Sequence, residues 1–181
     1  ILNAESRVQV SIESMLGNLP SYTQLGMASL LPNTALSFNP DEKQYVLVDG
    51  VSSKGTENRT KILSNKLSGK GVAITAEEFL GFASRTEGRE FAKQYEVIYI
   101  YHNGIDARGD DKKTESEVFE AVEKEFDVLN EILRKIANVN GTNVLLTADH
   151  GFLFQHEALE ENDFTKISKT KNIDVINRRF V

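Results

Sequence analysis

Asn143-Val-Leu-Leu-Thr-Ala-Asp-His-Gly151 is the stretch of this sequence that decides the fold. A short apolar run, Val144 to Leu146, stops at an adjacent acid and imidazole, Asp149 and His150, and Gly151 then lets the backbone turn. Open α/β sheets place their functional groups at the carboxyl ends of buried strands. The stretch therefore predicts a strand that delivers two ligand-type side chains to a sheet edge. An ordinary exit from strand to loop has the same pattern and remains the alternative.

A second predicted strand, Val97 to Tyr101, ends in the same way. Its β-branched and aromatic residues suit a central strand, and a loop rich in acids follows it. Carboxylates crowded into one loop repel one another unless a cation or a guanidinium such as that of Arg108 lies among them, or solvent screens them. Two strand ends of this kind favour a shared metal site. The side chains concerned in this loop are His102, Asp106, Asp110 and Asp111.

The clearest predicted helix, residues 115–137, connects these two strands. Its apolar side chains recur at helical spacing along one face, which is typical of a helix packed on a sheet. Strand, helix and strand then form one βαβ unit, so the two strands should be parallel, with Asp106, Asp110, Asp149 and His150 at one sheet edge. We also expect strands at 7–12, 45–49 and 72–75, and helices at 25–31, at 56–67 with Thr56 as a cap, and at 76–91 with a possible break at Gly88.

This alternation predicts an α/β fold, a three-layer α/β/α sandwich with a mostly parallel sheet. The 181 residues suit one domain or a fragment of a larger one, and the amino terminus indicates an excised piece. A net charge of −6 argues against a broad nucleic-acid surface. The sequence has no cysteine, so metal ligands must be oxygen or imidazole, and no apolar run is long enough to cross a membrane. We expect a cytoplasmic protein.

Thr23 opens the predicted helix at 25–31. A hydroxyl at a helix start most often caps the helix, but it can also act as a nucleophile or bind a metal. Arg59, near another helix start, is either a solvated arginine or a phosphate-binding residue. His102 is either a partner that orients a ligand carboxylate or a satisfied histidine at a strand end.

Four motifs of this chain resemble a known family. Thr23 behind Leu19-Pro20, Asp106 four residues before Asp110, and Thr147-Ala-Asp-His-Gly151 resemble the ordered motifs of the alkaline phosphatase superfamily. More narrowly, longer motifs of this chain are similar to those of the PglZ family. These are phosphatase-like proteins of bacterial BREX phage-defence systems. The longer motifs are Leu19-Pro-Ser-Tyr-Thr-Gln-Leu-Gly-Met-Ala-Ser-Leu-Leu-Pro32, Asp49-Gly-Val-Ser-Ser-Lys-Gly-Thr-Glu-Asn-Arg59, Tyr101-His-Asn-Gly-Ile-Asp-Ala-Arg-Gly-Asp110 and Thr147-Ala-Asp-His-Gly-Phe-Leu153.

The resemblance implies a role for each site residue. Thr23 becomes the nucleophile or a metal-bound hydroxyl, Asp149 and His150 ligands of the same metal as Thr23, and Asp106 and Asp110 ligands of a second metal. The resemblance implies two divalent cations, with zinc expected. The superfamily usually has His at the place of Asp110, so this site is harder and more oxygen-rich, which favours manganese or magnesium as alternatives. An Asp before the nucleophile and a later His have no convincing counterpart here. Residues 1–181 are therefore expected to be a partial, single alkaline phosphatase-like domain, which can be inactive by itself.

Three hypotheses about function follow. The leading one is a metal-dependent phosphoester hydrolase of a BREX defence protein, with other BREX proteins as partners and DNA reached only through such a complex. The second is a catalytically inactive phosphatase-like scaffold that binds defence partners or DNA. The third is a single structural cation held by Asp106, Asp110 and Asp111, which requires Asp149 and His150 to point away from that loop.

Overall fold

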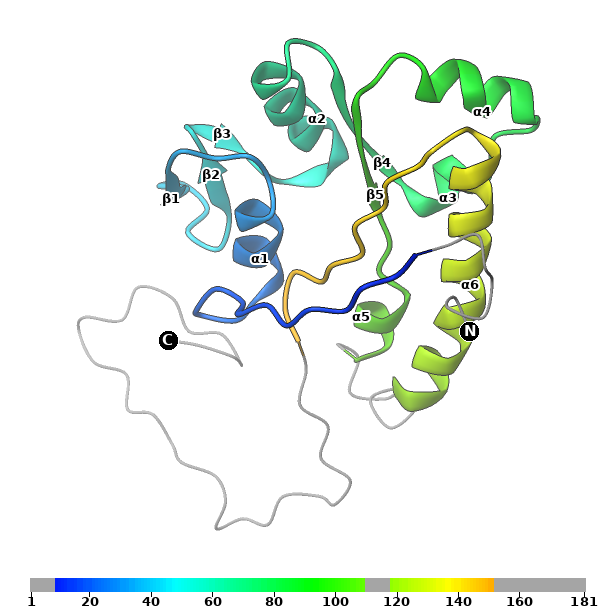
Figure 1. Ribbon diagram of the computed structural model, residues 1–181. Helices are drawn as coiled ribbons and strands as arrows, with labels where there is room; N and C mark the ends of the chain where they lie inside the picture. The colour runs from blue at the N-terminus through cyan, green and yellow to red at the C-terminus, as the bar shows by residue number, and fades with distance from the viewer. Residues whose placement is uncertain (1–8, 110–117, 152–181) are drawn as a thin grey trace.

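A computed structural model describes residues 9–109 and 118–151 of the chain (Figure 1). The predictions for Asp110, Asp111 and the start of the strand at 7–12 lie outside the described residues.

Two parallel strands form the centre of the fold. β4 (Gly71–Thr75) and β5 (Val97–Tyr101) pair in register, from Gly71 opposite Val97 to Thr75 opposite Tyr101. Both correspond to predicted strands. Their β-branched and aromatic residues fit a pleated surface that is covered on both sides.

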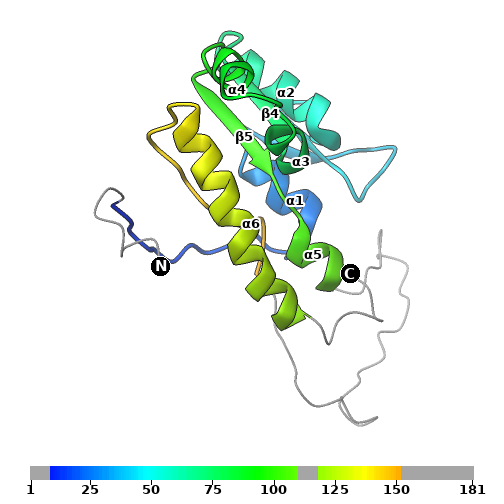
Figure 2. The ribbon, with the colours of Figure 1, turned by 90° about the vertical axis from the view of Figure 1, so that its right-hand side faces the viewer.

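The two faces of this pair carry different cores, because successive side chains of a strand point to opposite sides. Ala73, Tyr99 and Tyr101 pack with α1 (Thr23–Ser29), α2 (Gly55–Lys66) and β2 (Val46–Val48). Ile74, Ile98 and Ile100 pack on the other side, against Phe79 of α3 (Ala76–Leu80) and Val139 after α6 (Val118–Asn138). Helices therefore cover both faces of the parallel pair, as Figure 2 shows from the side.

A small antiparallel sheet lies beside α1. β1 (Leu36–Phe38), β2 and β3 (Val51–Ser52) pair in that order. Asp49 and Gly50 join β2 to β3 with φ values of 48° and 82°, which is the conformation that an Asp-Gly hairpin turn requires. The Asp49 carboxylate also accepts hydrogen bonds from the backbone N–H groups of Thr34 and Ala35 and pairs with Lys66 at 2.7 Å. Neither β1 nor β3 was expected from the sequence.

The predicted helix at 76–91 is two helices, α3 and α4 (Arg85–Ala92). The break falls at residues 81–84 and not at Gly88, because the Ser84 side chain accepts a hydrogen bond from the backbone of Glu87 and starts α4. Thr75 starts α3 through a capping box with Glu78. The expected cap at Thr56 is wrong, since α2 begins at Gly55 after Lys54 and has no side-chain cap.

Two expected strands are wrong in the part of the chain that the structure describes. Residues 9–12 and 144–146 form no strand, and their apolar side chains lie open, with Ile12 95% and Leu145 88% exposed. An apolar run becomes a buried strand only where neighbouring elements cover it, and here they do not. Residues 142–150 nevertheless pass β5 in the same direction (Figures 1 and 2), so Asp149 and His150 reach the end of the molecule where α5 (Gly104–Gly109) follows β5.

The fold is therefore α/β, with described strands in one parallel pair and one antiparallel sheet of three. The three-layer sandwich with a mostly parallel sheet is not confirmed.

Candidate active site

Thr23 is the first residue of α1, and its side chain does not cap that helix. The N-cap position belongs to Tyr22, which is extended and makes no side-chain cap hydrogen bond. The Thr23 hydroxyl instead lies 3.1 Å from Nε2 of His150, 127 residues later in the chain. Of the two roles considered for Thr23, the capping role is wrong.

His150 is the centre of the cluster. Its side chain is 8% exposed, and its Nε2 lies 3.5 Å from Oδ2 of Asp149 and 3.7 Å from Oδ1 of Asp106. Asp106 follows β5, as the sequence predicted, but it is carried by the helix α5, where the sequence predicted a loop. Four side chains from three segments therefore meet at one end of the parallel pair: Thr23, Asp106, Asp149 and His150.

The hydrogen bonds of His150 indicate its tautomer. Nδ1 lies 2.9 Å from the carbonyl oxygen of Gly151, and a carbonyl oxygen can only accept a hydrogen bond. Nδ1 therefore carries a proton, and in the neutral form of the ring Nε2 presents a lone pair to the cluster. In that form the Thr23 hydroxyl donates the hydrogen bond to Nε2.

Asp149 contributes a buried anionic oxygen. Its side chain is 15% exposed, and Oδ2 has no hydrogen-bond partner among the described residues. An unpaired carboxylate oxygen is costly to bury, by about 1–3 kcal/mol or more. Such an atom next to an imidazole lone pair is suited to a cation or to a donor brought by a ligand.

A glycine of α1 lets the Asp149 segment approach. A Cβ atom built on Gly26 would lie 2.2 Å from the carbonyl oxygen of Asp149 and 2.9 Å from its Cβ. Gly26 is one turn after Thr23, so the two residues share a helix face. Gly26 was not among the predicted site residues, because the sequence does not show which backbone segment packs against it.

Arg59 and His102 lie in other environments. Nε of Arg59 donates to the carbonyl oxygen of Ser53, and its guanidinium stacks on the Tyr101 ring, 4.4 Å from the centroid. Burial raises the pKa of the Tyr101 hydroxyl to about 12. His102 pairs with Glu125 of α6 through Nε2, so it is a histidine satisfied by a carboxylate next to α5.

Asp110, the remaining predicted ligand, lies outside the described residues. Within residues 9–109 and 118–151 there is no group of three or more His, Cys, Asp or Glu side chains already arranged to hold a metal ion. The cluster of four is thus a set of suitable donors and not a complete metal centre. Nε2 of His150 lies 3.7 Å from Asp106, whereas the third hypothesis, that of a structural cation in the acidic loop alone, requires His150 to point away from that loop.

Comparison with known proteins identifies close similarity over the whole chain. The PglZ family, described as the BREX system PglZ alkaline phosphatase-like domain, matches residues 1–181. The chain is 43% identical over 182 residues to the "Alkaline phosphatase-like protein BrxZ" of Escherichia coli O9:H4 (strain HS). It is 39% identical over 183 residues to the "Alkaline phosphatase-like protein PglZ" of Bacillus cereus (strain H3081.97).

These alignments include 99% and 100% of this chain but 21% of each relative, so the chain spans about a fifth of their length. No solved structure matches it. Among the described helices, none is both long and apolar enough to cross a membrane.

Proposed function

Because the chain belongs to the PglZ family of alkaline phosphatase-like domains of BREX systems, we propose that it forms part of the site of a metal-dependent phosphoester hydrolase. The observation that carries the proposal is the meeting of Thr23, Asp106, Asp149 and His150, which come from three separate segments. We further propose that residues 1–181 are part of one alkaline phosphatase-like domain.

The types of donor atom suit a divalent cation, although the described residues do not form a complete set of ligands. Around Nε2 of His150, the oxygens of Thr23, Asp149 and Asp106 lie at 3.1, 3.5 and 3.7 Å. Two ligands of one tetrahedral ion with bonds of about 2.1 Å are separated by about 3.4 Å. The unpaired Oδ2 of Asp149 and the lone pair of Nε2 are the atoms that such an ion binds. Asp149 and His150 would hold one ion together with Thr23, and Asp106 with Asp110 a second.

When bound, two divalent cations, zinc or alternatively manganese or magnesium, would neutralise charge on the phosphoryl oxygens and favour deprotonation of a coordinated hydroxyl. The protein supplies the orientation. Nε2 has one lone pair, so it either accepts the Thr23 hydrogen bond or would hold a cation, and in the second case the Thr23 hydroxyl would be available to the same cation or to the substrate. The Gly151 carbonyl keeps Nδ1 protonated and therefore fixes the ring in both states.

Arg59 is proposed as a substrate-binding residue of lesser weight. Its contacts with Ser53 and Tyr101 hold it at the end of β5 that leads to the cluster, where a guanidinium can bind an anionic group. Phosphomonoesters, phosphodiesters and sulfate esters all fit this chemistry.

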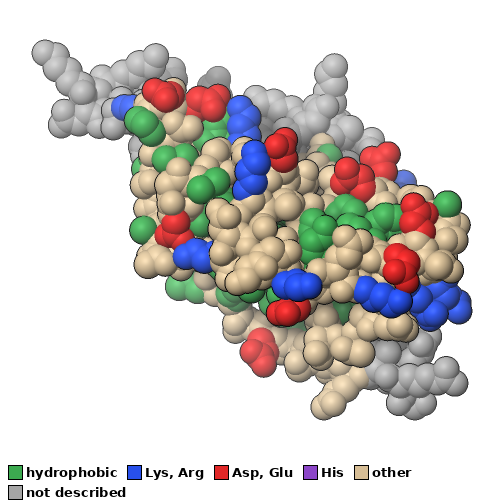
Figure 3. Space-filling model, turned by 90° about the horizontal axis from the view of Figure 1, so that it is seen from above, with side chains coloured by type: hydrophobic (Ala, Val, Ile, Leu, Met, Phe, Trp, Pro, Cys, Tyr) green, Lys and Arg blue, Asp and Glu red, His purple; other side chains and the backbone are tan. Residues whose placement is uncertain are grey.

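For partners, we propose other BREX proteins, with DNA contacted only through the complex. On the face seen in Figure 3, acidic and basic side chains are interspersed and form no broad basic surface, which agrees with the net charge of −6. A cytoplasmic location stays a prediction.

A second candidate function, a scaffold that binds defence partners and catalyses nothing, is favoured by a different observation. Several large apolar side chains are exposed along two extended segments, and exposed apolar surface commonly marks a binding site. They include Ile12, Leu16, Leu19 and Leu145. Metal content separates the two functions, because a scaffold purifies without stoichiometric divalent ions.

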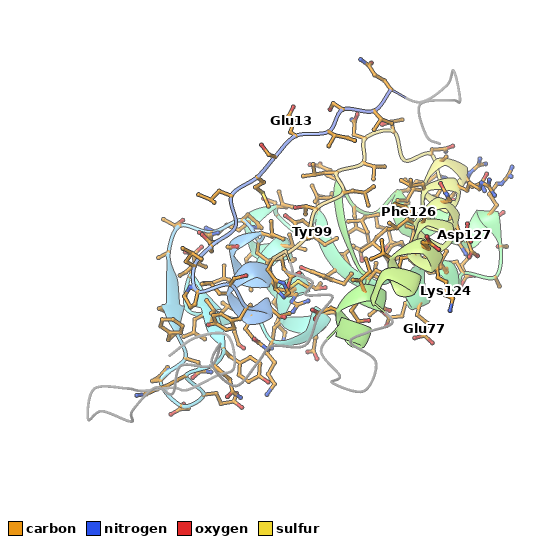
Figure 4. The ribbon with its side chains drawn as sticks, turned by 90° about the horizontal axis from the view of Figure 1, so that it is seen from below. Glu13, Glu77, Tyr99, Lys124, Phe126 and Asp127 are labelled. Carbon is orange, nitrogen blue, oxygen red and sulfur yellow. The ribbon has the colours of Figure 1, made fainter. Side chains whose placement is uncertain are left out.

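The test uses the intact protein that contains this chain. Thr23→Ala and Asp149→Ala should each abolish the metal-stimulated hydrolysis of nitrophenyl phosphate and bis-nitrophenyl phosphate. Asp127→Ala, which removes an exposed acid from α6 (Figure 4), is the matched control and should keep wild-type activity. Activity retained in either site variant would remove that residue from the mechanism, and an inactive, metal-free wild-type protein would favour the scaffold.

A further inference from the structure

Gly26 of α1 lies so close to Asp149 that a side chain at this position would overlap it. A Cβ at position 26 would lie 2.2 Å from the Asp149 carbonyl oxygen, 2.7 Å from its carbonyl carbon and 2.9 Å from its Cβ. Two of these atoms are backbone, so no side-chain rotation relieves the overlap. Gly26 is also buried, and its own carbonyl accepts a hydrogen bond from the Leu30 backbone within the helix turn.

Backbone conformation does not explain the glycine. Positive φ angles occur at Gly50, Gly55 and Gly69 among the described glycines, and Gly26 is not one of them. In a helical conformation alanine is the better helix former, so glycine at this position weakens a helix of seven residues. The close approach of Asp149 is the remaining structural reason for a glycine here.

The consequence for the site follows from the helix geometry. Thr23 and Gly26 lie on one face of α1, and that face contacts both members of the Asp149–His150 pair: the hydroxyl meets His150, and the bare Cα meets the Asp149 backbone. From these contacts we infer that Gly26 is a positioning residue, which sets the distance between the Thr23 hydroxyl and the Asp149–His150 pair. Only the expected effect on catalysis rests on the proposed function; the positioning role itself does not.

The size of the effect can be worked from the contact. Ordinary contact between heavy atoms begins at about 3.5 Å, so a methyl group at position 26 must displace the Asp149 segment by about 1 Å. An equal retreat of His150 lengthens its 3.1 Å contact with Thr23 to about 4 Å, beyond a hydrogen bond. A displacement of about 1 Å at a reacting group lowers rates by about 100-fold.

The experiment compares Gly26→Ala with Gly17→Ala in the intact protein. Gly17 is exposed and has nothing within 4 Å of an added Cβ, so it controls for the loss of a glycine. The first readout is the Nε2 and Hε1 resonances of His150 in metal-free protein. Gly26→Ala should shift them in the same direction as Thr23→Val, which removes the hydroxyl, whereas Gly17→Ala should leave them unchanged. The second readout is titration with Zn²⁺ alone, for which Gly26→Ala should bind at least 10-fold more weakly than Gly17→Ala.

Wild-type His150 resonances and wild-type Zn²⁺ affinity in Gly26→Ala would overturn the inference. Loss of cooperative thermal unfolding in Gly26→Ala would also overturn it, because the effect would then be general packing and not local positioning. A wild-type protein that binds no Zn²⁺ and hydrolyses no ester would contradict the proposed function, while the His150 resonances would still decide the role of Gly26.

Discussion

Asp149→Asn is expected to make the metal-free protein more stable than wild type and to remove the stabilisation that bound metal gives to the wild type. In the structure, Oδ2 of Asp149 is buried and has no hydrogen-bond partner among the described residues, and the Asp106 carboxylate approaches the same histidine nitrogen. An ionised Asp149 carboxylate thus has no hydrogen-bond donor at Oδ2 within the described residues, and a bound cation would stabilise it. A substitution of the same shape that removes this charge takes away the cost of burying it and leaves the packing unchanged.

The magnitude comes from burial. An unsatisfied buried polar group costs about 1–3 kcal/mol, and the 15% exposure of the Asp149 side chain places the gain near the lower end, at about 1 kcal/mol. For a domain of this size, that corresponds to a rise of about 2–4 °C in the unfolding midpoint. Stability gained together with function lost is the signature of a site under electrostatic strain.

The assay is thermal unfolding of the intact protein in a chelator and in excess Zn²⁺. In the chelator, Asp149→Asn should unfold at a higher temperature than wild type. In Zn²⁺, the wild-type midpoint should rise by mass action and that of the variant should stay close to its metal-free value. Asp127→Asn should behave as wild type in both. The reasoning is refuted if metal-free Asp149→Asn unfolds at or below the wild-type midpoint, or if Zn²⁺ protects it fully.

Three further predictions follow. Thr23→Val, which keeps the shape but loses the hydroxyl, should lower metal-stimulated hydrolysis by at least 100-fold in steady-state assays, and Thr23→Ser should recover part of it. The hydrogen bond from Lys66 lowers the pKa of Asp49 in the folded protein. The stability that Asp49 contributes is therefore present above its unfolded pKa and is lost as the pH falls through its folded pKa. Asp49→Asn should flatten this acid dependence in urea titrations at pH 3 to 7. Thr75→Ala breaks the capping box of α3 and should cost about 1 kcal/mol in the same titrations, whereas an unchanged midpoint would show that the box contributes nothing.

Local pattern was sufficient for much of the fold. The β-branched run at Val97–Tyr101 predicted β5 with its bounds, and the apolar stripe of residues 115–137 predicted α6, whose described bounds are Val118–Asn138. The expected strand at Val144–Leu146 failed for a physical reason. An apolar run indicates burial, but whether a partner covers it depends on the rest of the structure, and Leu145 is 88% exposed. β3 was missed because it has two residues, although the Asp49-Gly50 dipeptide before it is a hairpin signal.

Some features of the site were likewise predicted from the sequence and others were not. The crossover rule, applied to an expected strand at Val144–Leu146, predicted Asp106 at the same edge as Asp149 and His150. That strand does not form, but Nε2 of His150 lies near both carboxylates. Spacing along the sequence did not determine that Thr23 reaches them, since 127 residues separate it from His150; the family resemblance supplied that expectation. Gly26 escaped both arguments, because its role depends on one close contact with a backbone atom that no local pattern encodes.

We propose that Thr23, Asp149 and His150 hold one cation and that Asp106 lies beside them at the second. An anomalous-scattering map of crystals of the intact protein, soaked with zinc or manganese and vanadate, tests this most directly. We expect a metal peak bonded to Asp149 and Nε2 of His150, with the Thr23 oxygen on the vanadium or on the metal. The proposed site would be contradicted if metal and vanadate bound elsewhere while these four side chains stayed close together with no ion among them.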